Sequence, residues 1–123
     1  MKRINYIPSI VEVENNKVIT KGHLMVYIPK KAIFEIFDTS SGGEMSDIVH
    51  QGIYRLEEPR EVHTDFWTNV AIPLFTTSIP GICIQPNKEK CSTACLVTTD
   101  KERDDYLFKL LKENWFGMVL TVY

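Results

Sequence analysis

The chain has 123 residues, of which 44% are apolar and 24% are charged, as expected for one soluble globular domain spanning residues 1–123. The formal net charge is −2, and the 14 basic residues are scattered among 16 acidic ones. Proteins that bind nucleic acids usually present a basic face that neutralises phosphates, so general binding of DNA or RNA is disfavoured.

The first apolar run is too short for a signal peptide or a membrane span, because Pro8, Glu12 and Glu14 interrupt it. No later window stays apolar for the roughly 18 residues that a membrane-spanning helix needs. Three cysteines are an odd number for a disulfide framework. We therefore expect a cytoplasmic protein with free thiols and no contact with a membrane.

Residues 4–29 predict a β-hairpin. Residues 4–13 are rich in β-branched side chains and read as a strand, in which Pro8 removes one backbone donor and indicates an edge. Residues 14–17, with the sequence ENNK, suit a turn because asparagine tolerates the left-handed conformation that tight hairpins need. Residues 18–29 then form the returning strand.

Residues 31–56 are less clear. Residues 31–38 fit either a strand or a short helix, and residues 39–44 read as a loop because of their paired glycines. A helical stripe follows at Met45, Ile48, Val49, Ile53 and Leu56. A strand over the sequence GIYRLEE is the alternative, and we prefer the helix.

Residues 61–68 alternate as a strand would, and they contain the candidate binding surface. His63, Asp65 and Trp67 would share one strand face, where a histidine beside an acid could act as a general base. No serine or cysteine is tied to them by a pattern. A binding surface anchored by Trp67 is therefore the preferred interpretation over catalysis by His63 and Asp65.

The C-terminal third predicts a β-α-β unit. Residues 91–99 read as a strand, and Thr99 and Glu102 have the spacing of a helix capping box. A helix with an apolar face follows, and residues 118–123 are a nearly continuous apolar strand, typical of a strand inside a sheet. A helix between two such strands suggests a right-handed crossover between parallel neighbours. The predicted fold class is α+β, a mixed sheet with an N-terminal hairpin, about two helices and this unit.

The three cysteines, Cys83, Cys91 and Cys95, occupy what looks like a second hairpin. A five-residue loop would bring all three thiols to one face, and a four-residue loop would turn Cys83 away. Their spacing is not that of a zinc site or a redox pair, and a catalytic cysteine would need His50 or His63 as its base. Packing as small apolar residues is the interpretation we adopt, with a metal site as the minor alternative.

No pattern in the chain identifies a cofactor, a phosphate loop or a nucleophile with its base. The sequence therefore favours a small interaction or ligand-binding protein without catalytic activity, whose partner is another protein or a small molecule. An accessory, inhibitor or immunity role is typical of such domains but rests on no residue here. The exposed aromatics and the N-terminal edge strand also suggest a homo-oligomer. The alternative is a small hydrolase or nuclease acting on a nucleotide-like substrate through His63 and Asp65.

Overall fold

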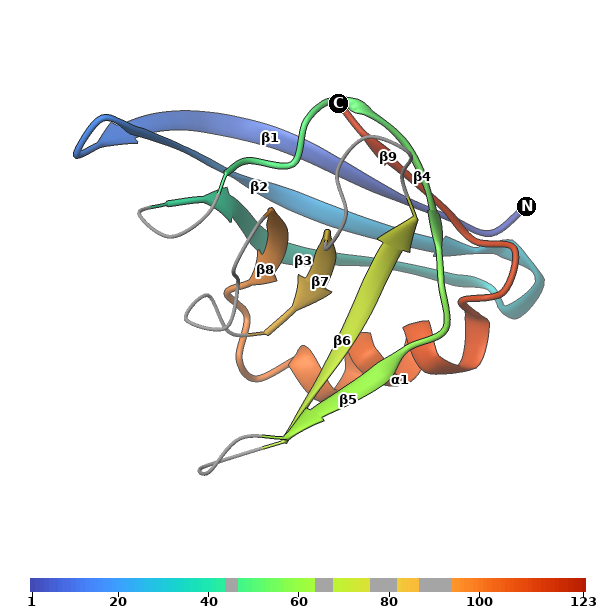
Figure 1. The fold of residues 1–123 in the computed structure, drawn as a ribbon. Helices are drawn as coiled ribbons and strands as arrows, with labels where there is room; N and C mark the ends of the chain where they lie inside the picture. The colour runs from blue at the N-terminus through green and yellow to red at the C-terminus, as the bar shows by residue number, and fades with distance from the viewer. Residues whose placement is uncertain (44–46, 64–67, 76–81, 87–93) are drawn as a thin grey trace.

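The structure is a computed structural model that describes residues 1–43, 47–63, 68–75, 82–86 and 94–123, and the side chains of 61–63, 68–71 and 75 are not described. Strands account for most of these residues (Figure 1). The strands are β1 (Arg3–Glu14), β2 (Lys17–Ile28), β3 (Ile33–Gly42), β4 (Gly52–Leu56), β5 (Arg60–His63), β6 (Thr68–Phe75), β7 (Cys83–Gln85), β8 (Cys95–Thr98) and β9 (Val119–Val122). The helices are the 3-10 turn η1 (Pro29–Lys31) and the α-helix α1 (Asp104–Asn114).

The strands form a closed barrel. They follow the order β4-β9-β1-β2-β3-β8-β7-β6-β5, and β4 also pairs with β6. Eight strands therefore close on themselves, while β5, among the described strands, pairs only with β6, over residues Thr68–Ala71. Most neighbours are antiparallel, and the pairs β1–β9 and β7–β8 are parallel. The predicted α+β fold with about two helices is wrong, because long-range pairing closes the sheet and leaves one short α-helix in the described chain.

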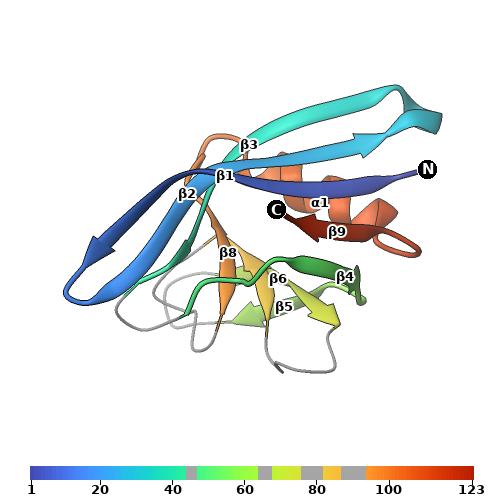
Figure 2. The ribbon, with the colours of Figure 1, turned by 90° about the horizontal axis from the view of Figure 1, so that it is seen from above.

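The N-terminal hairpin confirms its prediction. β1 and β2 pair antiparallel from Arg3 and Tyr27 to Glu14 and Lys17. The turn residues Asn15 and Asn16 have φ angles of 50° and 63°, the left-handed conformation required by a two-residue turn that matches the strand twist. In Figures 1 and 2 this hairpin extends beyond the rest of the molecule.

A bulge at Ser9 shifts the register of the hairpin, since Pro8 lies opposite Gly22 and Ile10 lies opposite Lys21. The backbones come very close here: a Cβ atom on Gly22 would lie 2.1 Å from the carbonyl oxygen of Ile7. Only glycine fits at this position. A bulge of this kind bends a strand and increases its local twist.

The core lies inside the barrel and continues onto α1. On β1 and β2 the inward-facing side chains alternate with exposed ones, as a half-buried strand pair requires. α1 lies on the side away from the C-terminus (Figure 1), and Leu107 and Leu111 on its buried face join the same core as the strands. One contiguous core of buried side chains therefore connects the helix to the barrel.

The predicted helix over Met45–Leu56 is wrong. Residues 48–51 contain no helix, and Gly52–Leu56 form β4, as the alternative strand reading had it. β4 lies between β9 and β6, and this pairing outweighs the helical spacing of its apolar residues. The loop predicted for residues 39–44 is also wrong for Thr39–Gly42, because these residues continue β3 and pair with β2.

The C-terminal strand, helix and strand occur, but they are not a crossover between neighbours. β8 pairs with β3 and β7, whereas β9 pairs with β1 and β4. β9 is an interior strand, as predicted. The capping box does not form, since α1 begins at Asp104 after Arg103 and has no side-chain cap. Thr98 instead donates its hydroxyl hydrogen bond to the Asp104 carboxylate.

Candidate functional site

A pocket of about 380 Å³ lies at one end of the barrel, where β1, β2 and β9 meet residues 48–51. We call it the mouth pocket. Its lining comes from four separate parts of the chain: Tyr6, Pro8, Thr20, Ile48, Val49, His50, Gln51, Val122 and Tyr123. The volume falls in the range of pockets that hold small molecules.

Two hydroxyls supply the buried polar chemistry of the mouth pocket. The Tyr6 hydroxyl lies 2.9 Å from Thr20 Oγ1, and both side chains are buried. Two hydroxyls that share one hydrogen bond retain one further donor and several lone pairs between them. The pair can therefore bind a hydroxyl, carbonyl or amine group of a small molecule while it keeps the hydrogen bond between Tyr6 and Thr20.

The acid–base state of Tyr6 suits binding more than catalysis. Burial raises the pKa of the Tyr6 phenol above its usual value near 10, and the hydrogen bond between Tyr6 and Thr20 offsets only part of this effect. The phenol is therefore neutral at physiological pH. A neutral phenol donates or accepts a hydrogen bond, but it is a poor base and a poor nucleophile.

Residues 48–51, which form the outer wall of the pocket, are held by side-chain hydroxyls. The Val49 N–H donates to Ser41 Oγ at 2.8 Å, and the Tyr54 hydroxyl donates to the His50 carbonyl oxygen at 2.7 Å. Gly42 lets this segment come close: its φ is 92°, and a Cβ atom there would lie 2.8 Å from Cγ2 of Ile48. The wall is thus anchored on both β3 and β4.

The pocket lining carries little charge. The described lining residues include no Asp, Glu, Lys or Arg side chain, and His50 is exposed at the rim. Apolar side chains of Pro8, Ile48 and Val122 line the pocket together with the hydroxyl pair. A neutral molecule with an apolar body and one polar group fits such a lining better than an ion does.

The predicted surface of His63, Asp65 and Trp67 lies mostly outside the described residues. β5 ends at His63, whose backbone pairs with Thr68 of β6, so residues 61–68 are not one continuous strand. The His63 side chain, Asp65 and Trp67 are not described. The surface stays a prediction.

The predicted cysteine hairpin is wrong. β7 and β8 run parallel rather than as a hairpin, and Cys83 lies directly opposite Cys95. Both side chains pack with Val97 in a small buried cluster. Burial raises the pKa of the Cys83 thiol, whereas Cys95 is disulfide-bonded, so the expectation of free thiols fails at Cys95.

The minor alternative of a metal site gains no support, since the described residues contain no group of three or more His, Cys, Asp or Glu side chains arranged to hold a metal ion. Cys91 lies outside the described residues.

Sequence reasoning did not identify Tyr6 and Thr20 as functional residues. Tyr6 falls on the inward face of β1, and a buried tyrosine usually needs a partner for its hydroxyl. That signal indicates a polar group in the core. It does not indicate Thr20, because the bulge at Ser9 changes which residues of the hairpin share a face.

The fold and the pocket together define a closed, mostly antiparallel barrel with one α-helix among the described residues and a small-molecule-sized pocket at its end. No family model, curated protein or solved structure matches the chain. Within the described part of the chain, no helix has both the length and the apolar character needed to cross a membrane.

Proposed function

We propose that this protein is a small binding protein without catalytic activity, and that the mouth pocket holds its ligand. The observation that carries the proposal is the Tyr6–Thr20 hydroxyl pair, whose buried side chains line a pocket of about 380 Å³ together with apolar side chains and the polar residues His50 and Gln51. Pockets with a mainly apolar lining and a few convergent polar groups are the usual sites of small ligands. The ligand class is a neutral amphipathic molecule with one hydrogen-bonding group.

A neutral fluorescent probe tests the proposal. N-phenyl-1-naphthylamine has apolar rings and a single N–H, so it matches the lining of the mouth pocket. We expect saturable binding that Thr20→Val weakens by about twofold to tenfold, the equivalent of one hydrogen bond. Gln51→Trp should weaken it further, because the indole would occupy space at the rim of the pocket.

Thr121→Val is the matched control, because Thr121 lies on β9 next to Val122 but is not part of the pocket lining. It should bind the probe as the wild type does. Fluorescence titration gives the dissociation constants, and thermal melting confirms that each variant is folded. An absence of saturable binding, or equal affinities for Thr20→Val and Thr121→Val, would contradict the proposal.

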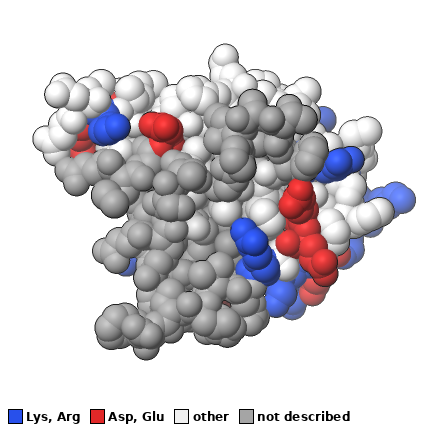
Figure 3. Space-filling model, viewed as in Figure 1, with Lys and Arg blue, Asp and Glu red and all other residues white. Residues whose placement is uncertain are grey.

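The other functional predictions from the sequence gain no specific support. The hydrolase or nuclease alternative depends on Asp65, which lies outside the described residues. General nucleic-acid binding stays disfavoured, and on the face shown in Figure 3 the described basic and acidic side chains lie close together rather than in separate fields. A cytoplasmic location stays a proposal that must account for the disulfide at Cys95, since oxidising compartments favour that state.

A further inference from the structure

The outer edge of β1 is open along half its length. β1 pairs with β2 from end to end, but on its other side it pairs with β9 only from Arg3 to Tyr6. The last contact on that side is the Tyr123 N–H, which donates to the Tyr6 carbonyl oxygen at 3.1 Å. Among the described residues, no strand pairs with this side of β1 from Ser9 to Glu14, which we call the free edge.

The hairpin geometry shows which backbone groups face the free edge. Glu14 and Lys17 flank a two-residue turn, so they exchange hydrogen bonds with each other across the hairpin. Alternate residues then point the other way, and Val11 and Val13 direct their N–H and C=O groups outward. Pro8, which has no N–H, also faces this side, beyond the end of β9.

The side chains at the free edge are apolar and exposed. Val11 and Val13 are 67% and 69% exposed, and Val18, the partner of Val13 on β2, is 42% exposed. Cross-strand partners share a face, so these three valines form one apolar strip. The strip leads to Thr20, the partner of Val11, and so reaches the lining of the mouth pocket.

We propose that two copies of the chain pair antiparallel through their free edges, with the two-fold axis at Val11. This register places Val11 opposite Val11 of the second copy, Ile10 opposite Glu12, and Ser9 opposite Val13. The outward N–H and C=O groups of Val11 are then satisfied by the same residue of the other copy. The valine strips of the two copies become continuous across the axis.

The acidic residues of the free edge select this register. An axis at Glu12 would place Glu12 opposite itself, and an axis at Val13 would place Glu12 opposite Glu14. Like charges directly opposite each other destabilise a strand pair. With the axis at Val11 no two carboxylates face each other, and Glu12 keeps its ion pair with Lys21 at 3.0 Å.

The flanking features limit the pairing to one partner. The bulge at Ser9 and the proline at position 8 end the regular edge on one side, and the Asn15–Asn16 turn ends it on the other. An isologous contact around a two-fold axis uses the same surface on both copies, so the assembly closes at a dimer. The inference concerns an edge of β1 and goes beyond the proposed ligand.

The mass of the ligand-free protein in solution tests the dimer. Light scattering coupled to size exclusion should give a mass that rises with concentration from 14.2 kDa towards twice that value. Val11→Pro removes only an edge-facing donor and leaves the hydrogen bonds to β2, so it should remain monomeric. Val11→Lys, which places like charges at the axis, should do the same, whereas Val11→Thr keeps the N–H and should still dimerise.

A cysteine pair tests the register. Val11→Cys should form a disulfide-linked dimer under mild oxidation, because the two copies of residue 11 would lie about 5.5 Å apart between Cα atoms. Val13→Cys is the matched control, since the two copies of residue 13 would lie about 14 Å apart. A wild type of 14.2 kDa at every concentration, or equal cross-linking of the two variants, would overturn the proposal. Both measurements use ligand-free protein, so they stand apart from the probe titration.

Discussion

Tyr6 introduces a phenol hydroxyl into the buried, mainly apolar core of the barrel. Its side chain is 1% exposed, and Thr20 is the hydrogen-bond partner that makes this burial tolerable. The two residues are 14 positions apart in sequence and come together because the hairpin folds back on itself. The same hydroxyl pair joins β1 to β2 and places two hydroxyl groups in the lining of the mouth pocket.

The raised pKa of Tyr6 predicts a loss of stability at high pH. Above pH 10 the unfolded chain releases the phenol proton first, while the folded chain retains it because burial raises the folded pKa. The free energy of unfolding should therefore fall as the pH rises above 10, by up to about 1.4 kcal/mol per pH unit for this group. Below pH 10 the contribution should be fully present.

Urea denaturation on either side of pH 10 measures this slope. Tyr6→Phe should cost about 1 kcal/mol at neutral pH through the lost hydrogen bond, and it should make the slope shallower. Tyr54, whose pKa burial also raises, should account for part of the slope that remains. If Tyr6→Phe and the wild type lose stability equally above pH 10, the raised pKa of the buried phenol is not the cause of the fall in the free energy of unfolding.

Single residues of the site could be predicted only in part. The inward position of Tyr6 follows from the alternation of β1, which the sequence shows directly. The presence of His50 and Val122 beside Tyr6 in the mouth pocket does not follow from the alternation. It depends on how β1, β9 and residues 48–51 come together in the fold. The surface of His63, Asp65 and Trp67 stays a prediction, because Asp65 and Trp67 lie outside the described residues, and the structure shows only that His63 and Thr68 belong to two paired strands.

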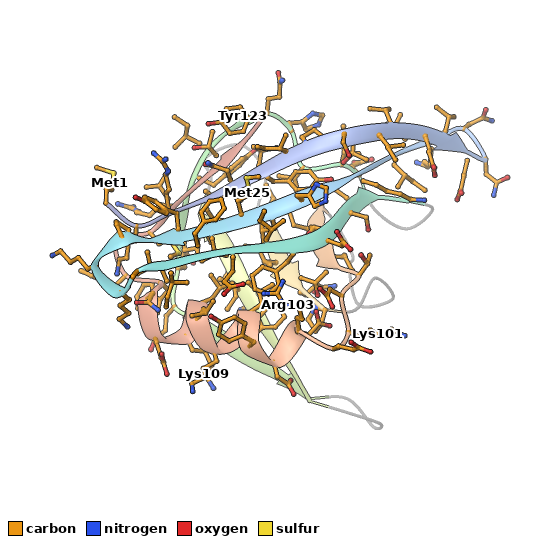
Figure 4. The ribbon with its side chains drawn as sticks, turned by 180° about the vertical axis from the view of Figure 1, so that it is seen from behind. Met1, Met25, Lys101, Arg103, Lys109 and Tyr123 are labelled. Atoms are coloured by element: carbon orange, nitrogen blue, oxygen red, sulfur yellow. The ribbon has the colours of Figure 1, made fainter. Side chains whose placement is uncertain are left out.

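α1 is attached to the barrel through Arg103, the residue before its first turn. The guanidinium of Arg103 donates to the Ile36 carbonyl oxygen and to the Glu35 carboxylate, and it lies 4.4 Å from the centre of the Phe37 ring. Figure 4 shows this side chain extending from the start of α1 towards β3. Tyr106 adds a hydrogen bond to Glu35 at 3.3 Å.

Arg103→Met should lower the free energy of unfolding by about 1–2 kcal/mol, since it removes a charge-assisted hydrogen bond and a cation–π contact. A double-mutant cycle with Glu35→Gln should give a coupling of about 0.5–1 kcal/mol, as expected for a partly exposed pair. Lys101→Met, at the exposed start of the same segment, is the control and should stay within about 0.5 kcal/mol of the wild type. A coupling of zero would show that Glu35 does not hold Arg103.

The strength of local signals decided which elements could be predicted. The Asn15–Asn16 turn and the alternation around it are local, so the hairpin was predicted correctly. α1 was predicted from its apolar stripe, although its start was placed too early. β4 was only the alternative prediction, because the apolar residues from Met45 to Leu56 have a helical spacing, and the pairing with β9 and β6 makes Gly52–Leu56 a strand.

The barrel is closed by β9 and by the short contact between β4 and β6. β9 lies between β4 and β1, and its residue Leu120 is fully buried opposite Ile4 and Tyr54. The β4–β6 contact joins Arg55 and Leu56 to Phe75 and Leu74. Many residues distant in sequence must therefore come together before the core is sealed.

Leu120→Ala should lower the free energy of unfolding by about 2–5 kcal/mol, because it leaves a cavity in the middle of the closed barrel. Ile53→Ala is the matched control on the neighbouring strand: Ile53 is 76% exposed, and its loss should cost no more than about 0.5 kcal/mol. Chemical denaturation of the two variants measures the difference. Similar stabilities would mean that β9 does not seal the core.

The amino-acid sequence alone specified those features that depend on neighbouring residues: the hairpin turn, the strand character of β1, β2 and β9, and the amphipathic face of α1. Tertiary structure decided which strands became partners, including the parallel pairs β1–β9 and β7–β8 and the closure of β4 on β6. The reason is physical. Side-chain alternation determines which face of a strand is buried, whereas the choice of partner depends on competition among all strands for backbone hydrogen bonds and core volume. The mouth pocket belongs to the second group, because it exists only where four segments meet.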